Sequence, residues 1–188
     1  KSTVDSVPVV SGVKIVGEKD EKLFDLLVSL YKPWMLKDFK DGAQWVIHAD
    51  VDGIERTIGV ISLWKSDYVQ IAVAPQYTGQ GIGLSAMSQI GKVVGIDRVN
   101  WSTHKSNKPS LQLLKSLGGG VFESGVTDDA QESVSGFYFT NGDSVTDEMS
   151  SALDAVIIQP VTMELSKRPK GVDAIARYIA SNTGSDDD

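Results

Sequence analysis

The sequence has 188 residues, 25 acidic and 18 basic side chains, a formal net charge of −7 and 41% hydrophobic residues, which is typical of about one globular domain. The lack of cysteine excludes disulfides, thiolate nucleophiles and cysteine zinc sites, and two distant histidines argue against a histidine-rich metal site, so we expect no metal ligands. No apolar run reaches the roughly 18 to 20 residues of a membrane span, and the first residues do not resemble a secretory signal. We therefore expect a soluble, cytoplasmic protein with no membrane partner.

The negative charge is concentrated in one segment. Residues 1–120 carry 12 acidic and 14 basic side chains, whereas residues 121–150 carry seven acidic side chains and no basic one. The overall sign argues against nucleic-acid binding, which needs clustered Lys and Arg. The acidic segment predicts a solvated loop or, alternatively, a surface that attracts a cationic amine or a basic partner protein.

Apolar spacing and turn residues predict strands and helices in alternation, which indicates a mixed α/β (α+β) domain. The expected strands are residues 13–16, 43–49, 56–64, 68–74, 99–103, 121–123 and 136–140. Helices are expected from Asp20 to residue 31, at 84–94, at 111–117, after Thr146, which is expected to cap its helix, and at 172–180, with a short helix or apolar lid at 34–39. The strand at 68–74 is almost wholly apolar or β-branched, which predicts a central position with both faces covered.

A glycine-rich turn, Gly79-Gln80-Gly81-Ile82-Gly83, connects that central strand to the next helix. Glycines let the backbone approach an anion closely, and the first amides and dipole of a helix attract negative charge. The spacing differs from both the Walker loop and the dinucleotide fingerprint. On glycine spacing alone, a phosphate site and a tight strand-to-helix turn without a ligand both remain open.

The longer segment from Val73 to Gly83, Val-Ala-Pro-Gln-Tyr-Thr-Gly-Gln-Gly-Ile-Gly, resembles the GNAT superfamily of acyl-coenzyme A-dependent N-acyltransferases. Its cofactor motif reads Val-x-Pro, then Gln or Arg, two residues, Gly, any residue, and Gly or Ala. The resemblance implies that this loop wraps the pyrophosphate of acetyl-coenzyme A (acetyl-CoA), although Thr78 replaces a common basic residue. The implied cofactor-binding residues here are Val73, Gln76, Tyr77, Thr78, Gly79, Gly81, Ile82 and Gly83.

A second segment, Asn107-x-x-Ser110-x-x-Leu113-Leu114-Lys115-x-Leu117-Gly118, is similar to the family pattern Asn-x-x-Ala-x-x-(Leu/Phe)-Tyr-x-(Lys/Arg)-x-Gly-Phe. The resemblance implies that Asn107 binds the cofactor arm. Leu114 stands where the family commonly has a tyrosine that protonates the departing thiolate, and Gly119 replaces the phenylalanine. Three readings stay open: the thiolate leaves without that acid, another hydroxyl substitutes, or the domain is not catalytic.

Direct attack by an amine on the thioester is the mechanism that the resemblance implies, and the amine must first lose a proton to a base. His104, at the end of the strand 99–103, is our first candidate for this base, against a reading as an ordinary hydrogen-bonding histidine. Asp67, with Tyr68, is the second choice, and His48 is interpreted as structural. The amide of Val73 is the expected donor to the thioester oxygen.

The resemblance implies a mixed, mostly antiparallel sheet with splayed central strands flanked by helices. We expect an acyl-CoA-binding domain at 1–142, a helical C-terminal extension at 143–182 and a disordered acidic tail at 183–188. The expected activity is acetyl transfer from acetyl-CoA to a primary amine, on a small molecule or on a protein lysine or N-terminus. The alternative is an inactive binding or structural module that docks on a partner, or forms a homo-oligomer, through its C-terminal helices.

Overall fold

The structure, a computed structural model, describes residues 8–30, 42–64, 67–77, 79–126, 132–155 and 171–181. The expected apolar lid at 34–39, the expected tail at 183–188 and Thr78 lie outside the described residues. Seven strands form one sheet in the order β1-β2-β3-β4-β5-β7-β6. They are β1 (Val10–Val16), β2 (Ala43–Val51), β3 (Ile54–Trp64), β4 (Tyr68–Val73), β5 (Arg98–His104), β6 (Gly120–Val126) and β7 (Glu132–Phe139).

The helices occur between and after these strands, as the apolar spacing predicts. They are α1 (Glu21–Leu30), the short 3-10 helix η2 (Pro75–Tyr77), α3 (Ile82–Val94), α4 (Lys108–Ser116), α5 (Asp147–Asp154) and α6 (Gly171–Ser181). The pairs β1–β2, β2–β3, β5–β7 and β6–β7 are antiparallel, whereas β4 runs parallel to β5 through Tyr68 and Asn100. The expected mixed, mostly antiparallel sheet and the central position of β4 are thus confirmed.

The chain divides into two compact units, which share β4 and α3. Unit 1 comprises Lys1–Leu63, Gln70–Ala86 and Arg168–Asp188, and unit 2 comprises Trp64–Val69 and Met87–Lys167. The two C-terminal helices therefore belong to different units: α6 to unit 1 and α5 to unit 2.

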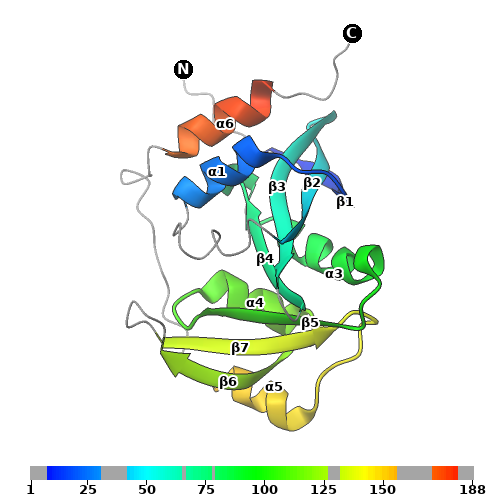
Figure 1. The fold of residues 1–188 in the computed structure, drawn as a ribbon, viewed down its shortest axis with the longest axis vertical. Coiled ribbons are helices and arrows are strands. Elements are labelled where there is room, and N and C mark those ends of the chain that lie inside the picture. Colours follow the sequence, from blue (N-terminus) through cyan, green and yellow to red (C-terminus); the bar gives the residue numbers. More distant parts are fainter. Residues whose placement is uncertain are drawn as a thin grey trace. The chain divides into compact units, whose positions relative to one another are not determined.

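In unit 1, α1 and α6 lie side by side (Figure 1). Leu23 and Leu27 of α1 and Ile175 and Ile179 of α6 are fully buried, which gives both helices an apolar face inside the unit. Asp20 caps helix α1, as the sequence predicts: its carboxylate accepts a hydrogen bond from the amide of Leu23 at 3.0 Å. The same carboxylate oxygen accepts the hydroxyl of Tyr178 at 2.6 Å, so one side chain both caps α1 and holds α6.

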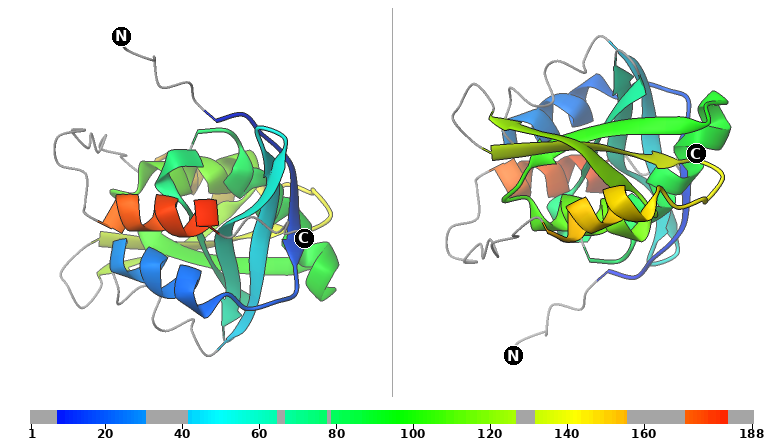
Figure 2. Two further views of the ribbon diagram at one scale, coloured as in Figure 1. Left: turned by 90° about the horizontal axis from the view of Figure 1, so that it is seen from above. Right: turned by 90° about the horizontal axis from the view of Figure 1, so that it is seen from below.

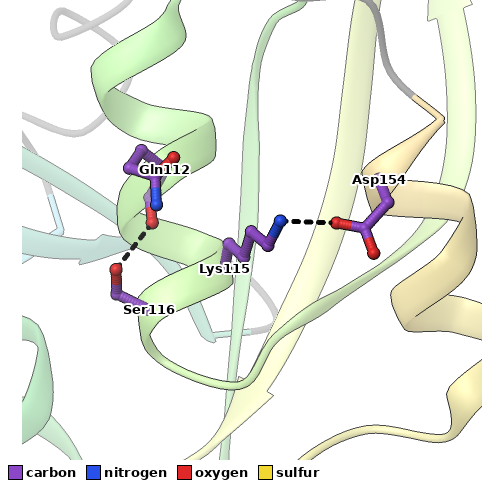
Figure 3. A network of polar contacts seen from close by, with 4 residues as sticks. All are labelled: Gln112, Lys115, Ser116 and Asp154. Carbon is purple, nitrogen blue, oxygen red and sulfur yellow. Dashed lines mark hydrogen bonds and ion pairs between the residues drawn. The ribbon is translucent and has the colours of Figure 1, made fainter.

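In unit 2, α5 packs beside β6, as the view from below shows (Figure 2). A side chain on Gly120 of β6 would overlap Val145 and Met149, so glycine allows this close approach. Helix α5 is also joined to α4 by an ion pair of 2.8 Å between Lys115 and Asp154 (Figure 3). Because both partners are more than half exposed, this pair adds little to stability.

Two local predictions were wrong. Strands β6 and β7 are longer than expected: β6 continues beyond Glu123 to Val126 and β7 begins at Glu132, because cross-strand pairing in the hairpin tolerates polar side chains that remain exposed on the strands. Thr146 occupies the position before α5, but its side chain makes no capping hydrogen bond. The first turn of α5 instead carries Asp147 and Glu148, whose charges favour a helix N-terminus.

Candidate functional site

The glycine loop in unit 1 begins where β4 ends. The amide of Ala74 donates to the carbonyl of Ile58 on β3 at 2.9 Å, and the amide of Tyr77 donates back to Ala74 at 3.0 Å. Gly79 and Gly81 follow with φ angles of +84° and +75°. A Cβ on either residue would meet no atom within 4 Å, so the backbone conformation, rather than lack of space, requires glycine here.

Helix α3 starts directly after these glycines. The carbonyl of Gly81 accepts the amide of Ser85 at 3.0 Å, which closes the first helical turn. The first amides of a helix have no partner inside it, and the first turn of α3 contains no acidic residue. This end of α3 therefore combines N–H groups and a positive dipole end with a glycine backbone that can approach a ligand, an arrangement that fits a diphosphate.

Two side chains of η2 lie at the start of the loop. Tyr77 is buried and only 6% exposed; burial raises the pKa of its hydroxyl, and the nearby Arg56 guanidinium opposes this shift. The side-chain oxygen of Gln76 is buried and has no hydrogen-bond partner among the described residues. A buried amide oxygen without a partner is costly, which makes Gln76 a candidate for contact with a bound ligand.

Gly59 of β3 allows close packing against β4 at the end that leads into the loop. A Cβ at Gly59 would lie 2.7 Å from the carbonyl oxygen of Ala72 and 3.2 Å from the Cα of Val73. Any larger residue would have to push this part of β4 away. Gly59 thus helps to place Val73, which was predicted to contact the thioester.

His104 and Asn107 are brought together in unit 2 by the turn that follows β5. His104 is the last residue of β5, pairs with Ser133 of β7 and is 6% exposed. Its carbonyl accepts the amide of Asn107 at 3.0 Å. Asn107 is the N-cap of α4, and its side-chain oxygen accepts the amide of Ser110 at 3.3 Å. The cap uses the oxygen of the Asn107 side chain and leaves its amide nitrogen out of this contact.

Asp67 and Leu114 have different surroundings. Asp67 is exposed, precedes β4 and has a φ of +59°, which is a turn conformation that aspartate tolerates. Leu114 of α4 is buried, with 1% exposure, and its side chain packs against Gly119 and Gly136. Position 114 therefore belongs to the apolar core of unit 2.

The structure places the predicted loop residues together in unit 1 and the predicted catalytic histidine in unit 2. The predicted site residues described in unit 1 are Val73, Gln76, Tyr77, Gly79, Gly81, Ile82 and Gly83, and the predicted site residues in unit 2 are Asp67, His104 and Asn107. Sequence reasoning missed Gly59, Arg56 and Gln80. Gln80 lies inside the motif, but its partners, Pro8 and Val10, are 72 and 70 residues away, so no local pattern reveals them.

The chain resembles known proteins in sequence and in fold. Residues 14–119 match the family model described as an acetyltransferase (GNAT) domain, and no curated protein sequence gives a significant match. A chimera of the spermidine N-acetyltransferase SpeG of Vibrio cholerae and hSSAT superposes with a TM-score of 0.52 and 13% identity over 70% of this chain and 98% of that one. The NatC complex bound to Gag peptide and CoA gives a TM-score of 0.51 and 14% identity over 69% and 99%.

A third similar structure is described as a putative phosphinothricin N-acetyltransferase, with a TM-score of 0.51 and 15% identity over 68% of this chain and 98% of that chain. At these identities the structures show a common fold. None of the helices in the described part of the chain has the length and apolar character that a membrane crossing requires.

Proposed function

Because the chain belongs to the acetyltransferase (GNAT) domain family, we propose that it binds acetyl-CoA at its glycine loop and transfers the acetyl group to a primary amine. The observation that carries this proposal is the backbone of Gly79 and Gly81, whose left-handed conformations lead directly into the N-terminus of α3. The bound cofactor supplies the acetyl thioester. The amides of Gly79, Gly81, Ile82 and Gly83 hold the diphosphate, with the side chain of Gln76 beside them.

In this proposal Asn107 donates its side-chain amide to the cofactor arm, and the amide of Val73 donates to the thioester oxygen, where negative charge develops during attack. The acceptor amine needs a base, and His104 has this role. His104 is largely buried at the end of a strand, and exclusion of water increases the effect of each polar group near the reacting atoms. Asp67, which is exposed and precedes β4, remains the second candidate.

We propose that the acceptor is a small-molecule amine or an amine of a protein, either a lysine or an N-terminus. The fold is compatible with both classes, since one similar structure is named as a spermidine N-acetyltransferase and another holds a peptide. The acidic segment 121–150 would attract either kind of cation. The proposed domain comprises residues 1–142 with the extension at 143–182, in the cytoplasm.

A second candidate function is cofactor binding without catalysis, and Leu114 favours it. The family tyrosine is replaced by an apolar residue that is buried in the core, so position 114 donates no proton. The companion idea, docking on a partner through the C-terminal helices, has less support for α6. Its residues Ile175 and Ile179 are already buried inside unit 1.

Calorimetric titration with acetyl-CoA tests the proposed binding, using Gly81→Glu as the variant and Gly53→Glu as its matched control. Gly53 has a φ of +89° and, like Gly81, open space at its Cβ position, so both substitutions cause similar backbone strain and add the same charge. A carboxylate at position 81 repels the diphosphate and should weaken binding by on the order of a hundredfold. Gly53→Glu should bind like the parent protein.

If the parent protein shows no binding, the cofactor assignment is wrong. If both glutamate variants lose affinity equally, strain rather than the loop explains the loss. Thiol release measured with a panel of amines then separates the enzyme from the inactive binding module, because only the enzyme releases free CoA in an amine-dependent reaction.

A further inference from the structure

Gln80, the residue between the two left-handed glycines, is hydrogen-bonded to the backbone of the N-terminal strand. Its side-chain nitrogen donates to the carbonyl of Pro8 at 2.7 Å, and its side-chain oxygen accepts the amide of Val10 at 3.1 Å. Both contacts lie within unit 1. They connect the glycine loop with a segment about seventy residues earlier in the chain.

The register of β1 explains why these two backbone groups face Gln80. Val10 pairs with Val51 of β2, and the amide of Asp52 donates to the carbonyl of Val9 at 3.0 Å. In an antiparallel pair this pattern makes Val10 a non-hydrogen-bonded position, so its amide points away from β2 toward the open edge of the sheet. The carbonyl of Pro8, two residues earlier, points the same way.

The carboxamide of Gln80 therefore pairs with the edge of β1 as the backbone of a further strand would. One donor and one acceptor of an edge strand, which would otherwise face solvent, are satisfied by a single side chain. Because the carboxamide is planar and both of its polar atoms are engaged, the two hydrogen bonds fix the orientation of Gln80 relative to β1.

Fixing Gln80 also restricts its two neighbours. Gly79 and Gly81 have φ angles of +84° and +75°, and glycine loses more backbone freedom on ordering than any other residue. A loop that is already held in one conformation loses less entropy when a ligand binds, and the saving appears as affinity. The bonds of Gln80 thus act on the same peptide groups that would contact a diphosphate.

We propose that Gln80 is a positioning residue for the cofactor loop: it fastens the loop to the edge of β1 and so holds Gly79 and Gly81 ready for the diphosphate of acetyl-CoA. This inference rests on the proposed function of the loop and assigns to strand β1 a part in cofactor affinity. It predicts a defect specific to ligands that carry the diphosphate.

The test compares acetyl-CoA with S-acetylpantetheine, which has the same thioester but lacks the diphosphate and nucleotide. Gln80→Leu keeps the size of the side chain and removes both hydrogen bonds. It should raise the dissociation constant for acetyl-CoA about tenfold and leave the KM for S-acetylpantetheine unchanged. The matched control is Gln112→Leu, the same substitution at an exposed position of α4, which should bind both ligands like the parent protein.

Val10→Pro tests the other end of the contact, since it removes the amide that Gln80 accepts, and proline is tolerated at the first residue of an edge strand. Val10→Pro should weaken acetyl-CoA binding by only about threefold, because it removes one of the two hydrogen bonds of Gln80 and keeps the bond to Pro8. Combined with Gln80→Leu it should add nothing further, because both changes break the same contact. Additive losses would show that the two residues act separately and would overturn the proposal.

The remaining outcomes are also decisive. Equal affinity of the parent protein and Gln80→Leu for acetyl-CoA, or an equal loss for both ligands, overturns the inference while the proposed function stands. If the parent protein binds no acetyl-CoA, the proposed function fails, and amide hydrogen exchange then decides whether Gln80 holds the loop. Faster exchange in Gln80→Leu at Ser85, whose amide donates to the carbonyl of Gly81, supports this contact, and unchanged exchange refutes it.

Discussion

Removing the hydroxyl of Tyr178 is expected to weaken the docking of α6 on α1. This hydroxyl donates to the carboxylate of Asp20 at 2.6 Å in a partly buried position. A hydrogen bond to a charged group contributes about 1.5 to 3 kcal/mol, and access of solvent reduces this value, so Tyr178→Phe should cost about 1 kcal/mol. For a chain of this size the expected fall in Tm is about 2 to 4 °C.

Asp20→Ala is expected to cost more than Tyr178→Phe, about 2 kcal/mol, because it also removes the cap on the amide of Leu23. The double variant should lose about 1 kcal/mol less than the sum of the single variants, since both remove the same contact. Urea denaturation followed by tryptophan fluorescence measures all four proteins. Losses that add within about 0.3 kcal/mol would refute the coupling of α6 to the cap of α1.

Tyr138→Phe should cost about 1 kcal/mol, because the hydroxyl donates to the carbonyl of Met87 at 2.8 Å. Burial raises the pKa of Tyr138, so its stabilisation is complete below about pH 10 and is lost as pH rises toward the folded pKa; urea denaturation should show a steeper alkaline decline in the parent than in the variant. Gly91→Ala should cost more than about 2 kcal/mol by the same measurement, because its Cβ would overlap Thr140. His104→Gln should lower turnover roughly a hundredfold; unchanged turnover from pH 6 to 9 would remove His104 as the base.

The order of the elements could be predicted because local signals agree along most of the chain. The apolar β-branched run of β4 indicates a central strand, Asp20 is a good N-cap, and the Asp52-Gly53 turn has the left-handed conformations that a tight hairpin requires. The glycine loop could be predicted for the same reason: its chemistry depends on consecutive backbone groups. Where function depends on neighbouring residues in the chain, the sequence is informative.

Contacts between distant residues could not be predicted. Gln80 reads as a variable position of the motif, and its role follows only from the register of β1 on β2, which exposes the amide of Val10 toward it. Arg56 reads as a surface residue of a hairpin strand, yet its guanidinium reaches the carbonyls of Ile179 and Ala180 at the end of α6, at 3.4 Å each. Such contacts depend on tertiary packing, and local propensity carries no information about them.

The two departures from the family pattern, Leu114 and Gly119, form one packing feature. A Cβ on Gly119 would overlap the Cδ1 of Leu114, and a Cβ on Gly136 would lie 3.0 Å from its Cδ2. Leu114 thus fills the space that two glycines leave, and the family phenylalanine at position 119 is incompatible with this arrangement. A tyrosine introduced at 114 alone would overpack the same space.

The packing of Leu114 limits how a thiolate could be protonated in the proposed reaction. Tyr138 cannot substitute for the missing tyrosine, because its hydroxyl is donated to the carbonyl of Met87 and burial raises its pKa. A simple thiol has a pKa of about 8.5, so near neutral pH a thiolate can depart and take its proton from water. If the chain is an enzyme, its rate should therefore depend more on deprotonation of the amine than on acid assistance to the leaving group.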